Sequence, residues 1–208
     1  MRVRVIMPEI HIVGTLRGAS HLPSTASAAF CRFELVAGAG WVLLDGALGG
    51  TTQTAAVDFS RGGGGAPLAT LSLVGAAAGA GAAAAAWEHP LDARFAVTDV
   101  AGWPQLCVTV WTLDALGRAD VAAYGTAFVP VSPGEHRLEH AAWRPEGTWL
   151  QELRAAVLGA GRPQLVDDAT LYAPAAATRH GLVTATAALV DVELAVVARG
   201  FAEAGASL

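Results

Sequence analysis

The sequence predicts an all-β protein, an antiparallel β-sandwich of about eight strands. Three observations support this fold class. Apolar residues recur at every second position, Gly and Pro interrupt that pattern at intervals typical of sandwich strands, and only one segment has helical spacing. A chain of 208 residues, 53% of them hydrophobic, is long enough to bury a core of its own.

The first half of the chain contains several expected strands. Ile10, Ile12 and Leu16 alternate with polar residues such as His11 and Thr15, which indicates a strand with one buried face. Turn sequences rich in Gly, Ser and Pro separate this strand from those that follow. The following strands are expected at Phe30–Val36, Trp41–Leu44 and Thr51–Ala56.

The second half continues with the same period. Leu106, Val108 and Val110 alternate with Cys107 and Thr109, which suits a central strand. Leu182–Val197 is long and β-branched, and is expected to form a closing strand or a hairpin. Further strands are expected at Ala93–Val97, at Ala119–Val129 and at the P-G-E-H-R-L-E-H segment of residues 133–140.

One short helix is expected at residues 148–158. Thr148 can cap it, and Gln151 stands three residues later as the partner in a capping box. Leu150, Leu153 and Val157 recur at helical spacing, and glycines follow to end the helix.

Residues 61–86 have no period-two face and almost no charge. The segment is rich in Gly and Ala, and we expect a flexible surface insertion between two strands, because loop closure costs grow slowly with length. A short helix over Ala82–Ala86 is the alternative. The glycines are not followed by the Lys-Ser/Thr pair of a phosphate-binding loop.

The charge of the chain argues against polyanionic partners. The formal net charge is −5, and the 13 basic residues, all arginine, are scattered singly. Nucleic acid requires a clustered positive face, and anionic membranes attract polybasic segments. We therefore expect no nucleic-acid partner and at most peripheral association with a membrane.

The N-terminal sequence and the cysteines indicate a soluble, intracellular protein. M-R-V-R-V-I-M-P-E lacks the long apolar core of a secretory signal, and no window of about 18 residues is apolar enough to span a bilayer. Cys31 and Cys107 each lie in an apolar strand pattern, so they are expected to be buried, reduced thiols.

Aromatic motifs concentrate between Trp87 and Trp149. Indole N–H groups need partners when they are buried, so tryptophans interleaved with Gly and Pro predict elaborated corners of a β domain. The motifs are W-E-H-P-L-D at 87–92, G-W-P-Q-L at 102–106, W-T-L-D-A-L-G-R at 111–118, Y-G-T-A-F-V-P-V-S-P-G at 124–134 and W-R-P-E-G-T-W at 143–149.

These motifs, in this order, resemble the B9 domain family, whose fold is a divergent C2-like β-sandwich. The similarity runs from about Pro8 to Arg199. It implies a single B9 domain over residues 8–199, with the 61–86 insertion inside it and a C-terminal tail at 200–208.

The resemblance also implies a function. B9 proteins are non-enzymatic components of the ciliary transition zone, in the cytoplasm at the ciliary base near the basal body. A partnership with two other B9-domain proteins, within the Meckel-syndrome (tectonic-like) complex, is implied, as are roles in cilium assembly and in gating the entry of proteins. No cofactor and no small-molecule substrate are expected.

The C2 likeness raises the question of calcium. Calcium-binding C2 loops supply several aspartates, because this hard cation takes 6–8 oxygen ligands. Here the matching positions are Thr112, Asp114 and Asp120, and the other loop is the neutral stretch Ser24–Ala29. We expect no metal site, only a degenerate remnant in which Asp114 and Asp120 form turns near Gly117. A weak calcium site is the minority interpretation.

No catalytic constellation stands out. His136 and His140 have the spacing of a helical zinc pair, but in a strand they lie about 13 Å apart, so solvated edge histidines are expected. No nucleophile elbow and no activated cysteine is present. No catalytic or cofactor-binding residue is therefore expected.

The candidate site residues are structural or interface residues. His89 is expected to be tied into a turn by a backbone hydrogen bond, or to form a partner contact together with Trp87. The full set is Trp87, His89, Pro90, Trp103, Pro104, Trp111, Tyr124, Gly125, Trp143 and Trp149. The favoured hypothesis is an assembly subunit, and the alternative is a calcium-independent module that docks lipid through its C2-like loops.

Overall fold

The computed structural model of the chain describes residues 7–62, 82–147, 164–165 and 183–201. These residues contain strands and no helix. The strands are β1 (Glu9–Ser20), β2 (Ala28–Val36), β3 (Trp41–Gly46), β4 (Gly49–Thr51), β5 (Ala55–Ala56), β6 (Asp58–Gly62), β7 (Ala82–Val97), β8 (Gln105–Leu113), β9 (Ala119–Phe128), β10 (Gly134–Pro145) and β11 (Thr184–Arg199).

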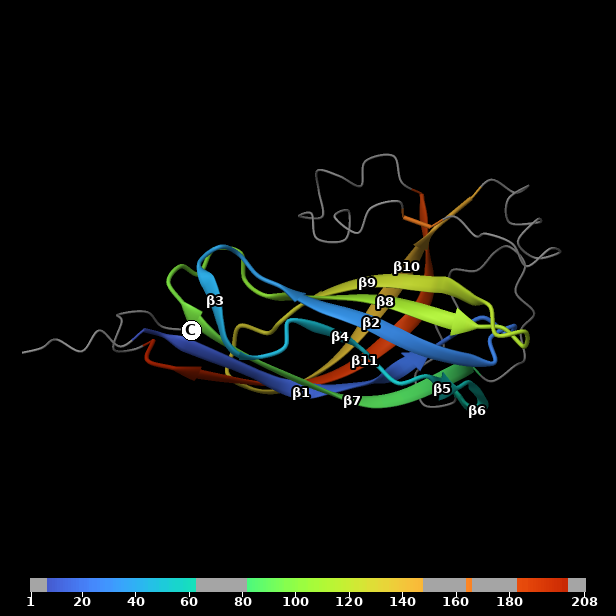
Figure 1. The fold of residues 1–208 in the computed structure, drawn as a ribbon, viewed down its shortest axis with the longest axis horizontal. Coiled ribbons are helices and arrows are strands. Elements are labelled where there is room, and N and C mark those ends of the chain that lie inside the picture. Colours follow the sequence, from blue (N-terminus) through green and yellow to red (C-terminus); the bar gives the residue numbers. More distant parts are fainter. Residues whose placement is uncertain (1–6, 63–81, 148–163, 166–182, 202–208) are drawn as a thin grey trace, which may run out of the picture.

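The strands form an antiparallel C2-like sandwich of two layers (Figure 1). One layer, called here the β1 sheet, has the order β3-β7-β1-β11-β10, and the other, the β2 sheet, has the order β9-β8-β2-β4. β10 pairs with β11 along its whole length but with β9 only where Trp143 lies opposite Tyr124. In Figure 1, β10 slants from one layer toward the other, so this strand joins the two sheets.

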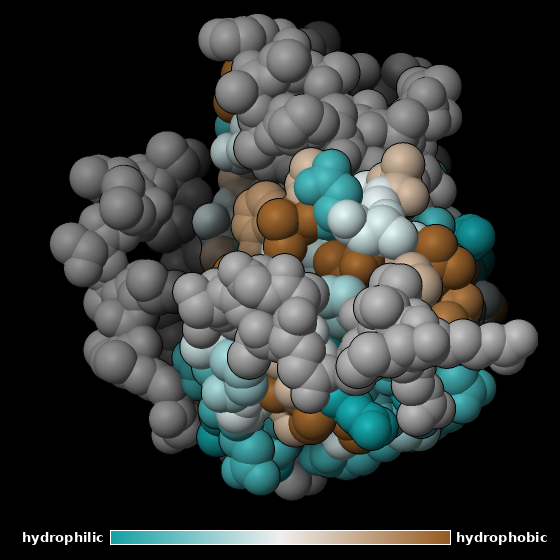
Figure 2. Space-filling model, turned by 90° about the vertical axis from the view of Figure 1, so that its left-hand side faces the viewer, coloured by the Kyte–Doolittle hydropathy of each residue, from teal (hydrophilic) through white to brown (hydrophobic). Residues whose placement is uncertain are grey.

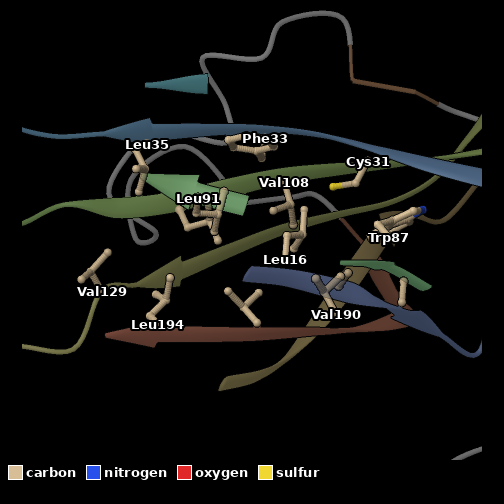
Figure 3. Packing of buried hydrophobic residues seen from close by; sticks show 14 of the residues in the cluster. Leu16, Cys31, Phe33, Leu35, Trp87, Leu91, Val108, Val129, Val190 and Leu194 are labelled. Atoms are coloured by element: carbon tan, nitrogen blue, oxygen red, sulfur yellow. The ribbon is translucent and has the colours of Figure 1, made fainter. Parts of the chain in front are cut away.

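The core lies between the two sheets, where alternate residues of each strand point inward. Leu16, Leu91 and Leu194 of the β1 sheet face Phe33 and Val108 of the β2 sheet (Figure 3). All of these side chains are buried. The period-two pattern of the sequence therefore corresponds to burial on one face of each strand.

The strands expected in the sequence are confirmed at most positions. β1, β2, β3, β8, β9, β10 and β11 contain the expected ranges to within a few residues at their ends. The C-terminal range forms one continuous strand, β11, rather than a hairpin. Cys31 and Cys107 are buried, as expected.

Two predictions about short elements were wrong. The expected strand at Thr51–Ala56 is split into β4 and β5. Between them, the Thr52 N–H donates to the Cys31 carbonyl at 2.8 Å, but the Cys31 N–H donates to the Thr52 hydroxyl, at 2.9 Å. Ala82–Ala86 is not a helix but the first part of β7, where Ala85 pairs with Ala19 of β1. The small residues suit this place, since a Cβ on Gly18 would lie 2.2 Å from the carbonyl oxygen of Ala85.

The limits of the Gly/Ala insertion change accordingly. β6 extends to Gly62 and β7 begins at Ala82, and these two residues pair with each other. Both ends of the expected 61–86 insertion are therefore strand. Its remainder, and the expected helix at 148–158, lie outside the described residues.

A β-bulge in β7 directs Trp87 into the core. Leu16 pairs with His89 and Gly18 pairs with Ala86, so Arg17 alone faces both Trp87 and Glu88. Glu88 adopts a left-handed backbone conformation with φ of 47°. Bulges of this kind re-aim a side chain. Here Trp87 becomes completely buried, and its indole Nε1–H donates to the carbonyl oxygen of Ala29 at 3.0 Å.

Candidate interaction surfaces

The turn between β8 and β9 is held by Asp114, as the sequence predicted. Its Oδ1 accepts the backbone N–H groups of Leu116 and Arg118 at 2.8 and 2.9 Å. Its Oδ2 accepts from the Arg118 guanidinium at 2.7 Å. Gly117 completes the turn with φ of 76°. The backbone N–H and the guanidinium of Arg118 lower the pKa of Asp114. A metal cation at this turn would compete with the guanidinium for the same carboxylate.

Asp120 is not a turn former, contrary to expectation. It lies in β9, directly opposite Thr112 of β8, and its carboxylate accepts the side-chain amide of Gln164 at 3.0 Å. Thr112 is buried. In the neighbouring loop, the Ser27 hydroxyl donates toward the carbonyls of Leu113 and Asp114 at 3.0 and 2.9 Å. Neutral hydroxyls and an arginine therefore occupy the C2-like loop end of the sandwich.

Within the described residues, no three His, Cys, Asp or Glu side chains are grouped to hold a metal ion. The same part of the chain contains no helix that is long and apolar enough to cross a membrane.

A tryptophan corner closes the opposite end of the sandwich. The rings of Trp41 and Trp103 meet edge to face with centroids 5.0 Å apart, and Phe95 packs on Trp41 at 5.9 Å. Both indoles donate to backbone carbonyls, Trp41 to Ala101 at 3.2 Å and Trp103 to Val129 at 2.7 Å. Trp103 thus has the structural role that interleaved aromatics suggested.

Backbone contacts make this corner rigid. Gly102 has φ of 70°, and a Cβ on it would lie 2.5 Å from the Cα of Gly38, so the close approach requires glycine. Pro104 is fully buried, and its carbonyl accepts the N–H of Val129 at 3.1 Å. The G-W-P motif therefore ties the loop before β8 to the loop after β9.

Exposed apolar side chains lie in the loops and at the end of β9 at this same end of the sandwich. Val100, Phe128 and Val131 are 54%, 70% and 52% exposed. Figure 2 looks onto this end and shows hydrophobic, brown atoms at the surface among the described residues. These side chains offer apolar contact area, with the exposed Asp99 directly before Val100.

Trp111, Tyr124 and Trp143 come together on the outer face of the β2 sheet. They form a cluster with Val121 and Leu165, and the rings of Tyr124 and Trp143 lie 5.6 Å apart. The backbone N–H of Leu165 donates to the Tyr124 hydroxyl at 3.1 Å. This outer cluster is separate from the core, so three motif residues far apart in sequence build one surface.

The outer cluster continues toward the free edge at β4. Phe30 of β2 stacks on Trp111 with centroids 6.0 Å apart and planes 3° from parallel. Arg32 follows Phe30 on the same face and is exposed, between Thr51 of β4 and Thr109 of β8 in the ladder. We call the depression formed here by Phe30, Arg32, Trp111 and β4 the Arg32 groove; its volume is about 590 Å³.

The W-E-H-P motif is divided between the core and the sandwich rim. Trp87 is in the core, Pro90 is exposed, and His89 is partly buried with its ring 5.3 Å from that of Phe33. His89 lies in β7 and not in a turn, because the strand continues through Pro90 to Val97. A partner contact at this motif would therefore involve His89 and not Trp87. Trp149 lies outside the described residues.

His140 is not a solvated edge histidine. β10 lies between β11 and β9, and the His140 Nε2 accepts the backbone N–H of Thr126 at 2.9 Å. A Cβ on Gly125 would lie 3.0 Å from the His140 ring, so glycine gives the imidazole its space. Burial lowers the pKa of His140. His136, by contrast, contacts the nearby Ser132 carbonyl, at 2.8 Å.

Exposed ion pairs cross the outer face of the β1 sheet. The pairs are Arg17–Glu193 at 2.6 Å, Arg137–Asp191 at 2.8 Å, Arg94–Glu9 at 2.5 Å and His11–Asp92 at 2.7 Å. Each such pair adds little stability. They do, however, compensate one another's charges on this face.

Comparison with known proteins identifies the family. Residues 10–197 match the family model B9-C2, described as ciliary basal body-associated, B9 protein. The chain is 36% identical to B9 domain-containing protein 2 of Homo sapiens over 195 residues, which cover 94% of this chain and 96% of that protein. For the Danio rerio protein of the same name, the identity is 34% over the same shares. The chain belongs to the B9 family.

Membership of the B9 family confirms the resemblance found in the motifs and makes the chain a cilium-associated protein. B9 domain-containing protein 1 of Mus musculus matches a shorter part, with 37% identity over 82 residues, 39% of this chain and 40% of that protein. A C2 domain of plant extended synaptotagmin 1 covers 93% of this chain and 96% of its own, with 12% identity and a TM-score of 0.38. That likeness is too distant to carry an argument.

The sequence did not point to several residues of this B9 domain that shape its surfaces. Arg118 neutralises Asp114, Leu165 covers Tyr124, and Phe30 and Arg32 extend the outer cluster. A signal existed for Phe30 and Arg32, since they alternate with the buried Cys31 and Phe33 and must point outward. An aromatic residue at an outward position is a reason to look for a contact surface.

Proposed function

We propose that this chain is a non-enzymatic assembly subunit of the ciliary transition zone. It binds two other B9-domain proteins within the Meckel-syndrome (tectonic-like) complex, and this assembly supports cilium formation and gates the entry of proteins into the cilium. The observation that carries the proposal is the family match over residues 10–197.

The geometry supports an assembly role in two ways. The Asp114 carboxylate is held by Arg118 and by backbone N–H groups, so a calcium ion would have to compete with these bonds for its oxygens. On the outer face of the β2 sheet, the partly buried rings of Trp111 and Trp143 pack on the buried Tyr124, and Trp is among the residue types enriched at binding hot spots.

Co-expression tests the proposal. The chain would be produced with B9 domain-containing protein 1 and the third B9-domain protein of the same organism, and the mixture purified through a tag on this chain. We expect a stoichiometric complex in size-exclusion chromatography. A monodisperse chain that leaves both siblings behind would contradict the proposal.

In ciliated cells, we expect the tagged chain at the ciliary base and fewer cilia after its deletion.

The alternative function is calcium-independent docking to a lipid surface. One observation favours it: Leu116 is 78% exposed at the tip of the β8–β9 turn, where C2-like loops are expected to meet a membrane. The net charge of −5 opposes binding to anionic lipid. Flotation with vesicles, with and without calcium, separates the two functions, since the assembly role predicts that the isolated chain stays unbound in both conditions.

A further inference from the structure

The Arg32 groove is an open, amphipathic depression on the outer face of the β2 sheet. The stacked rings of Phe30 and Trp111 form one wall. Gly49 and Gly50 of β4 line the opposite side, and β4 is the last strand in the order of the β2 sheet, so the groove reaches the edge of the sheet. An extended segment of another protein could therefore enter from this edge.

Arg32 has no ion pair among the described residues, unlike four other arginines of the chain. Arg17, Arg94 and Arg137 on the β1 sheet, and Arg118 in the β8–β9 turn, each contact a carboxylate at 2.8 Å or less. In the described part of the chain, no carboxylate lies within ion-pair distance of Arg32. Its guanidinium is exposed, beside two aromatic rings, and its five N–H donors can meet a partner.

The same face already binds a chain segment. Next to the groove, Leu165 packs against the buried pair Val121 and Tyr124, as Trp111 and Trp143 also do, and its backbone N–H donates to the Tyr124 hydroxyl. Gln164 adds a polar bond to Asp120 at 3.0 Å. In the outer cluster, the contact thus consists of an apolar side chain flanked by polar bonds. Trp111 belongs both to this cluster and to the lining of the Arg32 groove.

We propose that the Arg32 groove is the surface on which this chain docks a sibling B9 domain. The sibling contributes a carboxylate that pairs with Arg32 and an apolar side chain that packs on Phe30 and Trp111. This inference rests on the proposed function, since it specifies where and by what chemistry the assembly subunit binds. A carboxylate matches the guanidinium fork in geometry and charge.

A protein segment fits the groove better than a lipid surface does. Membranes attract clusters of basic residues, whereas Arg32 is a single cation on a chain of net charge −5. In the described lining of the groove, Arg32 is the one cation, beside Phe30 and Trp111 and with Glu34 two residues along β2. Arginine and tryptophan are residue types enriched at the centres of protein interfaces.

The test uses three forms of the full chain, each co-expressed with B9 domain-containing protein 1 and purified through a tag on this chain. They are the unaltered chain, Arg32→Glu and the control Arg199→Glu. Both variants reverse one exposed arginine, but Arg199 lies in β11 of the β1 sheet. Because Arg32 has no ion pair to lose among the described residues, we expect its variant to melt at the temperature of the unaltered chain.

We expect Arg32→Glu to bind the sibling at least about tenfold more weakly than the unaltered chain, and Arg199→Glu to bind it normally. If the unaltered chain and Arg32→Glu bind equally well, the groove is not the docking surface, although the proposed function stands. If the unaltered chain binds no sibling, both fail. Vesicle binding by the unaltered chain that Arg32→Glu abolishes would assign the groove to lipid and overturn the inference.

Discussion

At the scale of single residues, the family motifs serve three different environments. Trp87 is wholly buried, Trp103 packs in a corner, and Trp111 lies on an outer face. The same residue type is therefore used for packing, for bracing loops and for surface contact. What is common to Trp87 and Trp103 is an indole N–H directed at a backbone carbonyl.

Replacing Trp87 with phenylalanine tests its role in the core. The variant keeps an aromatic ring but removes the donor to the Ala29 carbonyl and leaves space beside it. We expect the free energy of unfolding to fall by about 1–3 kcal/mol, measured by urea denaturation. Phe128→Leu, at an exposed position, should change it by less than about 0.5 kcal/mol. Equal stability of Trp87→Phe and the unaltered chain would contradict this role.

His140 makes stability depend on pH. Burial lowers its pKa from the ordinary 6.5, and its Nε2 must stay unprotonated to accept the Thr126 N–H. As pH falls through 6.5, the unfolded chain therefore takes up a proton at this position before the folded chain does. The titration of His140 therefore does not change the free energy of unfolding well above pH 6.5, and it lowers this free energy progressively below that pH.

We therefore expect the urea midpoint to drop between about pH 7.5 and about pH 5.5, and to drop less in His140→Gln. Glutamine can accept the same N–H without titrating. An identical pH dependence of the two proteins would show that other groups cause the drop.

At the scale of elements, period two in the sequence was sufficient to predict the long strands, because one face of each is buried. The start of β7 could not be predicted in this way. Its alanines have no apolar alternation, and strand pairing with β1 is possible there because Gly18 and Ala19 allow a close approach. The outer cluster could not be predicted either, because its residues come together only when β8, β9 and β10 pair.

We expect the β8–β9 turn not to bind calcium. Asp114 binds its own backbone and Arg118, and its lowered pKa reflects those bonds. We expect millimolar calcium to leave Tm unchanged in the unaltered chain. Asp114→Ala should lower Tm equally with calcium and with EDTA, because the turn loses its acceptor. A calcium-dependent rise in Tm that Asp114→Ala abolishes would show instead that the site is functional.

At the scale of the whole molecule, the two outer faces of the sandwich differ in the side chains that they expose. The β1 sheet compensates its charges with its own ion pairs, such as Arg17 with Glu193. The β2 sheet displays aromatic rings and Arg32. The packing of the core constrains the inner faces of a sandwich, whereas its outer faces are free to differ, and this difference is the physical basis for expecting assembly through the β2 sheet.

The reactivity of the two buried cysteines can be used to measure how often the two sheets of the sandwich separate. Both are buried, in the neighbouring strands β2 and β8, and burial raises the pKa of Cys31 to about 12. The thiolate is the reactive form, so at neutral pH a thiol reagent should reach Cys31 only after the sheets separate. We expect labelling of Cys107→Ser, which retains only Cys31, to be slow in buffer and to accelerate in urea in parallel with global unfolding. Labelling in buffer as fast as that of a free thiol would mean that the β2 sheet opens locally, without the loss of the sandwich.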